Sequence, residues 1–290
     1  MSSATTPTGR SQIPVDILLI ILDNLDKSDI ATMCRLNKLC CAFSQPILFR
    51  DIHIEFQERV PFFSIKNERL YALCEALSQS PYLSRCVRSF SVRIYEISRR
   101  FQTKIAETLE FLPSLRHLGL YVYFNFTRLL KGRTFSFKLE SFSFYSSNTD
   151  IQEFLNSQPS LTTVNICFRN DLYSHRFKFE KKCLPNLTRV TTSFFYAEEF
   201  IRGRPVSEIT CTDQPYNRNN ITLDFFTLST APIRKLTIGH DFLYYGAKPG
   251  QLRELFPSLA HLELTGCHRF SVSVSVSLRL FIRLFKYVIG

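Results

Sequence analysis

A short pattern of residues, apolar-x-x-apolar-x-apolar, recurs eight times in the chain and constrains its fold more than any other feature. The first residues of the eight copies are 19 to 28 positions apart: Val87, Leu115, Leu139, Leu161, Leu187, Val206, Ile233 and Leu259. Spacings of about 20–29 residues are typical of solenoids in which every repeat contributes one strand to a parallel sheet. A single repeat cannot bury its apolar side alone, so we expect the repeats to stack around one continuous core.

The residues between the apolar positions provide an independent test of this interpretation, because the pattern is defined by its apolar positions alone. Three such positions alternate with the apolar ones in each copy, and only Tyr121, Tyr145 and Cys167 among these 24 residues are hydrophobic. This alternation is typical of strands that have one face in the core and the other open to solvent. We therefore predict eight strands with a shared polar face.

Helical patterns precede several of these strands, as with Ile105, Leu109 and Leu112 before Leu115. A proline then stands two residues before the first apolar residue of four strands: Pro113, Pro159, Pro185 and Pro257. Proline ends a helix, and it favours extended geometry in the residue before it. The order helix, proline, strand predicts an α/β fold, a right-handed solenoid with a curved parallel sheet and outer helices.

The region in front of the repeats has a different, helical pattern. Pro14 suits the first turn of a helix, and five apolar residues follow it at helical spacing: Ile17, Leu18, Ile21, Leu22 and Leu25. We predict a second helix capped by Ser28, and a third helix that runs from about Asn37 towards Phe43 before Pro46 interrupts it. Three short helices cannot bury all this apolar surface among themselves, so part of it must face the body or another protein.

The ordered series in this region resembles the F-box. The matching residues are Ile13-Pro14, the apolar series from Ile17 to Leu25, the Asp26–Asp29 turn, Ile30, Met33, Leu36-Asn37-Lys38 and the closing stretch from Pro46 to Ile52. The resemblance implies a three-helix module that docks onto the Skp adaptor, and through it onto the cullin–RING part of SCF-type ubiquitin ligases. The residues that would form or support this docking face are Ile13, Pro14, Ile17, Leu18, Ile21, Leu22, Leu25, Ile30 and Phe49. The family often has tryptophan where Phe49 stands and a bulky residue near Cys40 or Cys41.

The repeating body resembles the degenerate leucine-rich repeats that follow the F-box in many fungal F-box proteins. A non-catalytic receptor of this kind would bind a protein substrate on the concave polar face of its sheet. The candidate substrate-contacting residues on that face are Arg93, His117, Tyr121, Tyr145, Asn165, Arg189, Lys235, His261 and Glu263. The alternative is a leucine-rich-repeat interaction scaffold without ligase coupling, which the small side chains of Cys40 and Cys41 keep open.

The domain organisation that we expect has five segments. Residues 1–12 are a disordered leader, residues 13–54 the F-box, and residues 55–85 a helical connection or cap. Residues 86–267 are the solenoid, and residues 268–290 are a basic and apolar tail. We interpret this tail as a cap of the solenoid or a non-native end, in preference to a membrane contact.

Charge is distributed unevenly along the chain, which has a net charge of +11. The first 60 residues carry 6 basic and 7 acidic side chains, whereas the remaining 230 carry 30 and 18. A basic body can favour acidic proteins, nucleic acid or anionic lipid. We expect an unidentified protein substrate, which an excess of basic groups would allow to be acidic. We do not expect nucleic acid, because no basic-aromatic recognition motif accompanies the charge.

The sequence contains none of the phosphate-binding, nucleophile or zinc-protease motifs of common enzymes, and its nine cysteines lack zinc-site spacing. We therefore expect no catalytic residues, no metal and no cofactor. The absence of an apolar signal region and of an apolar run of about 18 residues predicts a cytoplasmic or nuclear protein.

Overall fold

The computed structural model describes residues 13–55, 65–94, 99–122, 127–146, 151–168, 179–180, 182–212, 223–239 and 254–265. The leader at residues 1–12 and the tail at residues 268–290 lie outside the described residues. Part of the connection at residues 55–85 also lies outside them.

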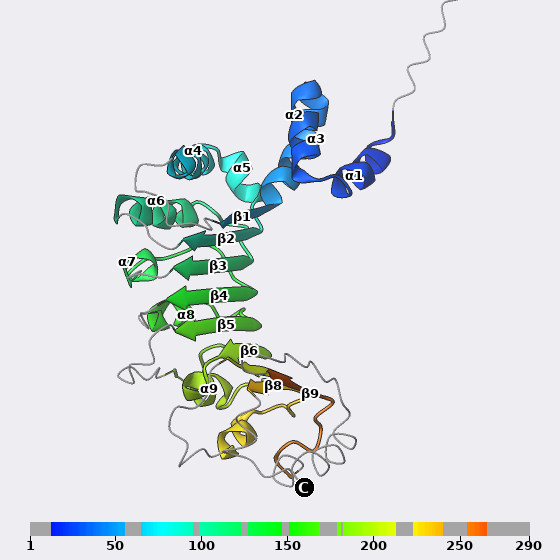
Figure 1. Ribbon diagram of the computed structural model, residues 1–290. Coiled ribbons are helices and arrows are strands. Elements are labelled where there is room, and N and C mark those ends of the chain that lie inside the picture. Colours follow the sequence, from blue (N-terminus) through cyan, green and yellow to red (C-terminus); the bar gives the residue numbers. More distant parts are fainter. Residues whose placement is uncertain are drawn as a thin grey trace, which may run out of the picture.

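Among the described residues, nine parallel strands form one sheet in which the order of strands is the order of the chain (Figure 1). The strands are β1 (Asp51–Glu55), β2 (Ser89–Ile94), β3 (His117–Val122), β4 (Ser141–Ser146), β5 (Thr163–Phe168), β6 (Arg189–Thr192), β7 (Glu208–Cys211), β8 (Lys235–Gly239) and β9 (His261–Thr265). The predicted α/β fold with a parallel sheet is confirmed, since each of the eight sequence patterns corresponds to one strand from β2 to β9.

Strand β1 is an addition that the repeat pattern did not reveal. It pairs with β2 in parallel, with Ile52 opposite Phe90 and Ile54 opposite Val92. This strand is not part of a sequence repeat, and it follows directly after the last helix of the front region, which ends at Arg50. The sheet therefore begins inside the segment that we expected to be helical.

Helices follow one another along one side of the sheet (Figure 1). They are α4 (Ile65–Gln79), α5 (Pro81–Cys86), α6 (Arg99–Glu110), α7 (Thr127–Leu130), α8 (Gln152–Asn156) and α9 (Phe194–Ile201), with a 3-10 helix η1 (Asp224–Leu228). The apolar residues of each strand face this side: Phe142 and Phe144 are buried, whereas Ser141, Ser143 and Tyr145 on the other side are half-buried. The core consequently lies between the sheet and the helices.

Phenylalanine fills this core where the helices are short. The rings of Phe142 and Phe154 are 5.1 Å apart and those of Phe135 and Phe137 are 5.0 Å apart. Further along the solenoid, Phe226 packs edge-on against Phe256 at 5.2 Å. Such aromatic pairs contribute about 0.5–1.5 kcal/mol beyond the apolar area that they bury. Part of the chain's 28 phenylalanines therefore serves to pack this core.

Three helices precede the sheet: α1 (Val15–Asp23), α2 (Lys27–Leu36) and α3 (Lys38–Arg50). The predicted cap of the second helix was wrong, because α2 begins at Lys27, two residues earlier than a cap at Ser28 would place it. Its cap is Asp26, whose side chain accepts a hydrogen bond of 2.9 Å from the main-chain N–H of Asp29. The pattern contains two residue types that can cap a helix, and only the position of the first turn decides between them.

The predicted end of the third helix was also wrong, because α3 passes through Pro46 and continues to Arg50. Proline cannot donate to the carbonyl of residue 42, which would be left without its usual partner. The hydroxyl of Tyr82 in α5 donates to that Ala42 carbonyl at 3.3 Å. A hydrogen bond from Tyr82, 40 positions further along the chain, therefore replaces the main-chain hydrogen bond that Pro46 cannot make.

Candidate functional site

The first helix exposes an unusual amount of apolar surface. Leu22 is the one residue of α1 that is fully buried, and Leu18 is half-buried. We define the α1 face by the exposed apolar residues of this helix and the residues before it: Ile13, Val15, Ile17, Leu19, Ile20 and Ile21. Ile13 and Ile20 are 61% and 59% exposed, and a concentration of exposed apolar side chains on one helix marks a candidate interaction site.

The residues predicted for adaptor docking do not all belong to this face. Ile13, Pro14, Ile17 and Ile21 are exposed, whereas Leu22 and Ile30 are buried within the described structure. Leu18, Leu25 and Phe49 are half-buried, and Phe49 packs against the core of the sheet. The buried positions therefore hold the helices together or attach them to the sheet, and the exposed ones are available to a partner.

Several exposed apolar residues were not among the predicted site residues: Val15, Leu19, Ile20, Leu36 and Leu39. Leu36 and Leu39 lie where α2 ends and α3 begins, and both are more than 60% exposed. The sequence signal that could have identified the α1 residues is the nearly continuous apolar run of residues 17–22. Six consecutive apolar residues cover all sides of a helix, and one small module can bury only one side, so some of these residues stay exposed.

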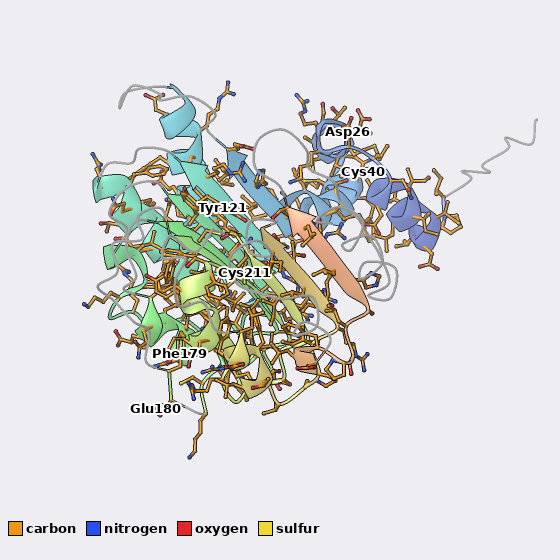
Figure 2. All side chains as sticks on the ribbon, turned by 60° about the horizontal axis from the view of Figure 1, so that its bottom comes forward. Asp26, Cys40, Tyr121, Phe179, Glu180 and Cys211 are labelled. Carbon is orange, nitrogen blue, oxygen red and sulfur yellow. The ribbon has the colours of Figure 1, made fainter. Side chains whose placement is uncertain are left out.

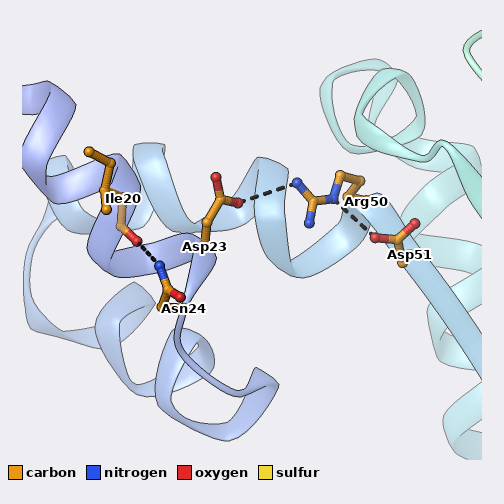
Figure 3. A network of polar contacts seen from close by, with 5 residues as sticks. All are labelled: Ile20, Asp23, Asn24, Arg50 and Asp51. Carbon is orange, nitrogen blue, oxygen red and sulfur yellow. Dashed lines mark hydrogen bonds and ion pairs between the residues drawn. The ribbon is translucent and has the colours of Figure 1, made fainter.

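A polar network holds the end of α1 beside the start of the sheet (Figure 3). The guanidinium of Arg50 lies 3.3 Å from the carboxylate of Asp23, the last residue of α1, and 3.0 Å from that of Asp51 in β1. The side-chain amide of Asn24 donates to the carbonyl of Ile20 at 2.8 Å. These groups are exposed, so they orient the helix more than they stabilise it.

The second candidate surface is the side of the sheet that faces away from the helices, which we call the open face. Its residues occupy the alternate positions of the strands: Asp51, His53, Glu55, Ser89, Ser91, Arg93, His117, Gly119, Tyr121, Ser141, Ser143, Tyr145, Thr163, Asn165, Cys167, Arg189, Thr191, Glu208, Thr210, Lys235, Thr237, Gly239, His261, Glu263 and Thr265. All nine predicted substrate-contacting residues lie on this face. His117 and His261 are six strands apart, so the sheet does not bring them together.

An ordered chain of contacts crosses the first three strands of the open face. Glu55 accepts a hydrogen bond of 2.9 Å from Arg93, and the guanidinium of Arg93 lies 4.9 Å from the centre of the Tyr121 ring. The ring lies close to Gly119, where an added Cβ would be 3.1 Å from Cε2 of Tyr121 and 2.8 Å from Oγ of Ser91. Gly119 thus leaves room for the ring of Tyr121, which Figure 2 labels over the strands of the sheet.

Three charged side chains at the other end of the open face also have polar partners, namely Arg189, Glu208 and Glu263. Arg189 in β6 lies 3.2 Å from the carboxylate of Glu208 in β7. Glu263 in β9 accepts a hydrogen bond of 3.2 Å from the hydroxyl of Thr237 in β8. Lys235 occupies the rung between Glu208 and His261. The pairs fix these side chains along the rungs of the sheet.

Two thiols of the helices, those of Cys74 and Cys34, have a raised pKa. Burial raises the pKa of Cys74 in α4. Burial also raises the pKa of Cys34 in α2, and the neighbouring Cys41 thiol raises it further. A raised pKa leaves little thiolate at neutral pH, and the thiolate is the reactive form. These two cysteines therefore have no feature of a nucleophile.

Within the described ranges, no three His, Cys, Asp or Glu side chains are arranged to hold a metal ion. None of the helices in these ranges is both long and apolar enough to cross a bilayer. No protein-family model matches the chain, and no curated protein matches it.

Proposed function

We propose that this protein is a substrate-recognition subunit of an SCF-type cullin–RING ubiquitin ligase. The α1 face docks onto the Skp adaptor, and the solenoid binds a protein substrate. The protein carries no catalytic residues of its own, and its contribution is to hold the substrate close to the ubiquitin-loaded partner.

The observation that carries the proposal is the exposed apolar α1 face on a three-helix module joined to a repeat solenoid. Ile17 and Ile20 are 48% and 59% exposed, and no described element covers them. Leaving such side chains in water is unfavourable, and burying one against a partner contributes about 1.5–3 kcal/mol. The F-box resemblance of residues 13–52 names the partner that such a face would bind.

The experiment is co-purification of the full chain with the Skp adaptor, followed by titration of the adaptor. Ile17→Asp and Ile20→Asp place a charge on the α1 face, and each is expected to weaken adaptor binding about 10- to 100-fold. Leu22→Asp is unsuitable because Leu22 is fully buried, so a charge there would unfold the module.

Phe111→Asp is the matched control, because Phe111 is 50% exposed and lies outside the three-helix module. It is expected to bind the adaptor as the wild type does, and circular dichroism should show all variants folded. Absence of binding by folded wild-type protein would refute the ligase function and leave an interaction scaffold. Equal loss in Phe111→Asp would show that the effect does not come from the α1 face.

A further inference from the structure

Among the described residues, the middle of the open face carries no Asp, Glu, Lys or Arg side chain. Strands β3, β4 and β5 present nine side-chain positions there, and none is Asp, Glu, Lys or Arg: His117, Gly119, Tyr121, Ser141, Ser143, Tyr145, Thr163, Asn165 and Cys167. We call these nine residues the neutral patch. Its side chains are hydroxyl, amide, imidazole, thiol and phenol groups, which can donate or accept hydrogen bonds when a partner covers them.

The described strands place no excess of positive charge on this side of the sheet. The open face holds three basic residues, Arg93, Arg189 and Lys235, and four acidic ones, Asp51, Glu55, Glu208 and Glu263. The net charge of +11 therefore comes from elsewhere in the chain. The excess of basic residues in the whole sequence allowed an acidic substrate. The open face, which is the surface expected to bind the substrate, does not share this excess.

The charged residues beside the neutral patch are engaged with one another. Arg93 is held by Glu55 at 2.9 Å, and Arg189 lies 3.2 Å from Glu208. A carboxylate brought onto the patch would lose water without meeting an uncompensated cation, and burial of such a charge is costly. A neutral hydrogen-bonding segment would avoid this cost and replace its water by hydroxyl and amide partners.

The patch also contains two tyrosines, a residue type that interfaces favour. Tyr121 and Tyr145 lie on the same rung of neighbouring strands. The guanidinium of Arg93 contacts the ring of Tyr121, and Gly119 leaves the room that this ring occupies. Tyrosine at a preordered position adds contact area at little entropic cost, which is why tyrosine and arginine are frequent at interface hot spots.

We infer that the neutral patch binds an uncharged, hydrogen-bonding segment of a partner protein, and that acidic segments are disfavoured there. This inference rests on the proposed function in taking the open face as the substrate-binding surface. It adds the chemistry of the segment, which is opposite to what the net charge of the chain favours.

The test uses the full chain and an array of immobilised peptides of equal length in three classes: uncharged polar, Asp/Glu-rich and Lys/Arg-rich. Wild-type protein should bind members of the uncharged class, with little change when salt is raised, because screening acts on charged pairs. Tyr121→Ala and Tyr145→Ala should each weaken this binding at least about tenfold. Phe195→Ala, an exposed aromatic residue on helix α9, is the control and should leave it unchanged.

Two variants at Ser143, in the middle of the patch, separate neutral from acidic recognition. Ser143→Asp and Ser143→Lys should both weaken binding of uncharged peptides, because either charge loses water when the segment covers it. An acidic partner would instead bind Ser143→Lys more tightly and Ser143→Asp more weakly. That opposite pair of responses, or a preference of the wild type for acidic peptides, would overturn the inference.

The inference would also be overturned if the wild-type protein bound no class of peptide. It would be overturned equally if the two tyrosine variants bound uncharged peptides as tightly as the wild type does. Adaptor binding is measured on the same proteins and should be unaffected at Tyr121, Tyr145 and Ser143, which lie outside the α1 face. If the wild-type protein binds uncharged peptides but does not bind the adaptor, the ligase proposal is refuted and the inference stands. Adaptor binding without peptide binding would refute the inference alone.

Discussion

At the scale of single residues, Arg204 is the most unusual group, because its charged side chain is only 2% exposed. Its guanidinium donates to the main-chain carbonyls of Cys183 at 2.8 Å, Glu199 at 2.6 Å and Arg202 at 3.2 Å. It also lies 5.3 Å from the centre of the Phe179 ring. Burial lowers the pKa of Arg204, yet arginine remains charged throughout the range in which proteins are stable. Arg204 thus ties the end of α9 to the preceding repeat.

Replacing Arg204 by methionine is expected to lower the free energy of unfolding by at least about 3 kcal/mol. The replacement keeps much of the apolar volume but leaves buried carbonyls without donors, and each lost charged hydrogen bond contributes about 1.5–3 kcal/mol. Urea unfolding followed by circular dichroism measures the change. Arg202→Met is the control, because the Arg202 side chain is 58% exposed and its loss is expected to cost less than about 0.5 kcal/mol. Equal effects of the two substitutions would contradict the structural role of Arg204.

At the scale of elements, α3 is a helix that depends on a neighbour. Pro46 removes one hydrogen bond from its interior, and Tyr82 in α5 donates to the carbonyl of Ala42 that would otherwise have lost its donor. Helix α3 then continues to Arg50 and passes into β1 without a linker. The helical module and the sheet are therefore joined by a continuous, tertiary-supported element.

A double-mutant cycle tests this dependence. Tyr82→Phe should lower the free energy of unfolding by about 0.5–1.5 kcal/mol in the wild-type background, since it removes one hydrogen bond. Pro46→Ala restores the main-chain donor, so the same Tyr82→Phe change should cost less in that background. Thermal and urea unfolding of the four proteins give the coupling energy. A coupling energy of zero would show that the two residues act independently and that Tyr82 does not support the helix at Pro46.

At the scale of the whole molecule, the sheet is a one-dimensional stack. Each strand pairs only with the strands before and after it in the chain, from β1 to β9. The stability of such an array is close to a sum of repeat and nearest-neighbour terms, so strands with two neighbours are held more firmly than terminal ones. The aromatic core around Phe142 and Phe154 adds to the middle of the stack.

Native-state hydrogen exchange should therefore show the strongest protection in β3 to β5 and weaker protection in β9. Strand β9 is paired on one side among the described residues, with β8, whereas β4 is paired on both sides. The opening free energies of individual amides provide the measurement. Uniform protection from β2 to β9 would indicate that the solenoid unfolds as a single cooperative unit instead.

The strands were predictable from the sequence because their signal is local. Alternation of apolar and polar residues with a period of two fixes which side chains enter the core, and the register follows from placing Phe90, Leu118, Phe142 and Val164 on one rung. The position of the proposed substrate-contacting residues on the open face was predictable for the same reason; their contact with a substrate stays a prediction. Strand β1 was not, because its residues follow a helix and belong to no repeat.

The α1 face was predictable only in part. Helical spacing placed Ile17, Leu18, Ile21 and Leu22 on one helix, but the sequence could not say which side of a helix that is apolar all round would be covered. Helix α1 packs against α3; Leu22 is buried, whereas Ile17 and Ile20 are exposed to solvent. Exposure is a property of the packed neighbours, and those neighbours come from other parts of the chain.

The sequence by itself determined the period of the repeats, the positions of eight strands and the polar character of the open face, since these depend on residues within a few positions of one another. Tertiary structure decided the passage of α3 through Pro46, the burial of Arg204 and the neutrality of the patch at the centre of the open face. Each of these depends on residues 20 or more positions apart being brought together. Local patterns set what each segment can become, and packing sets which of its groups meet solvent or a partner.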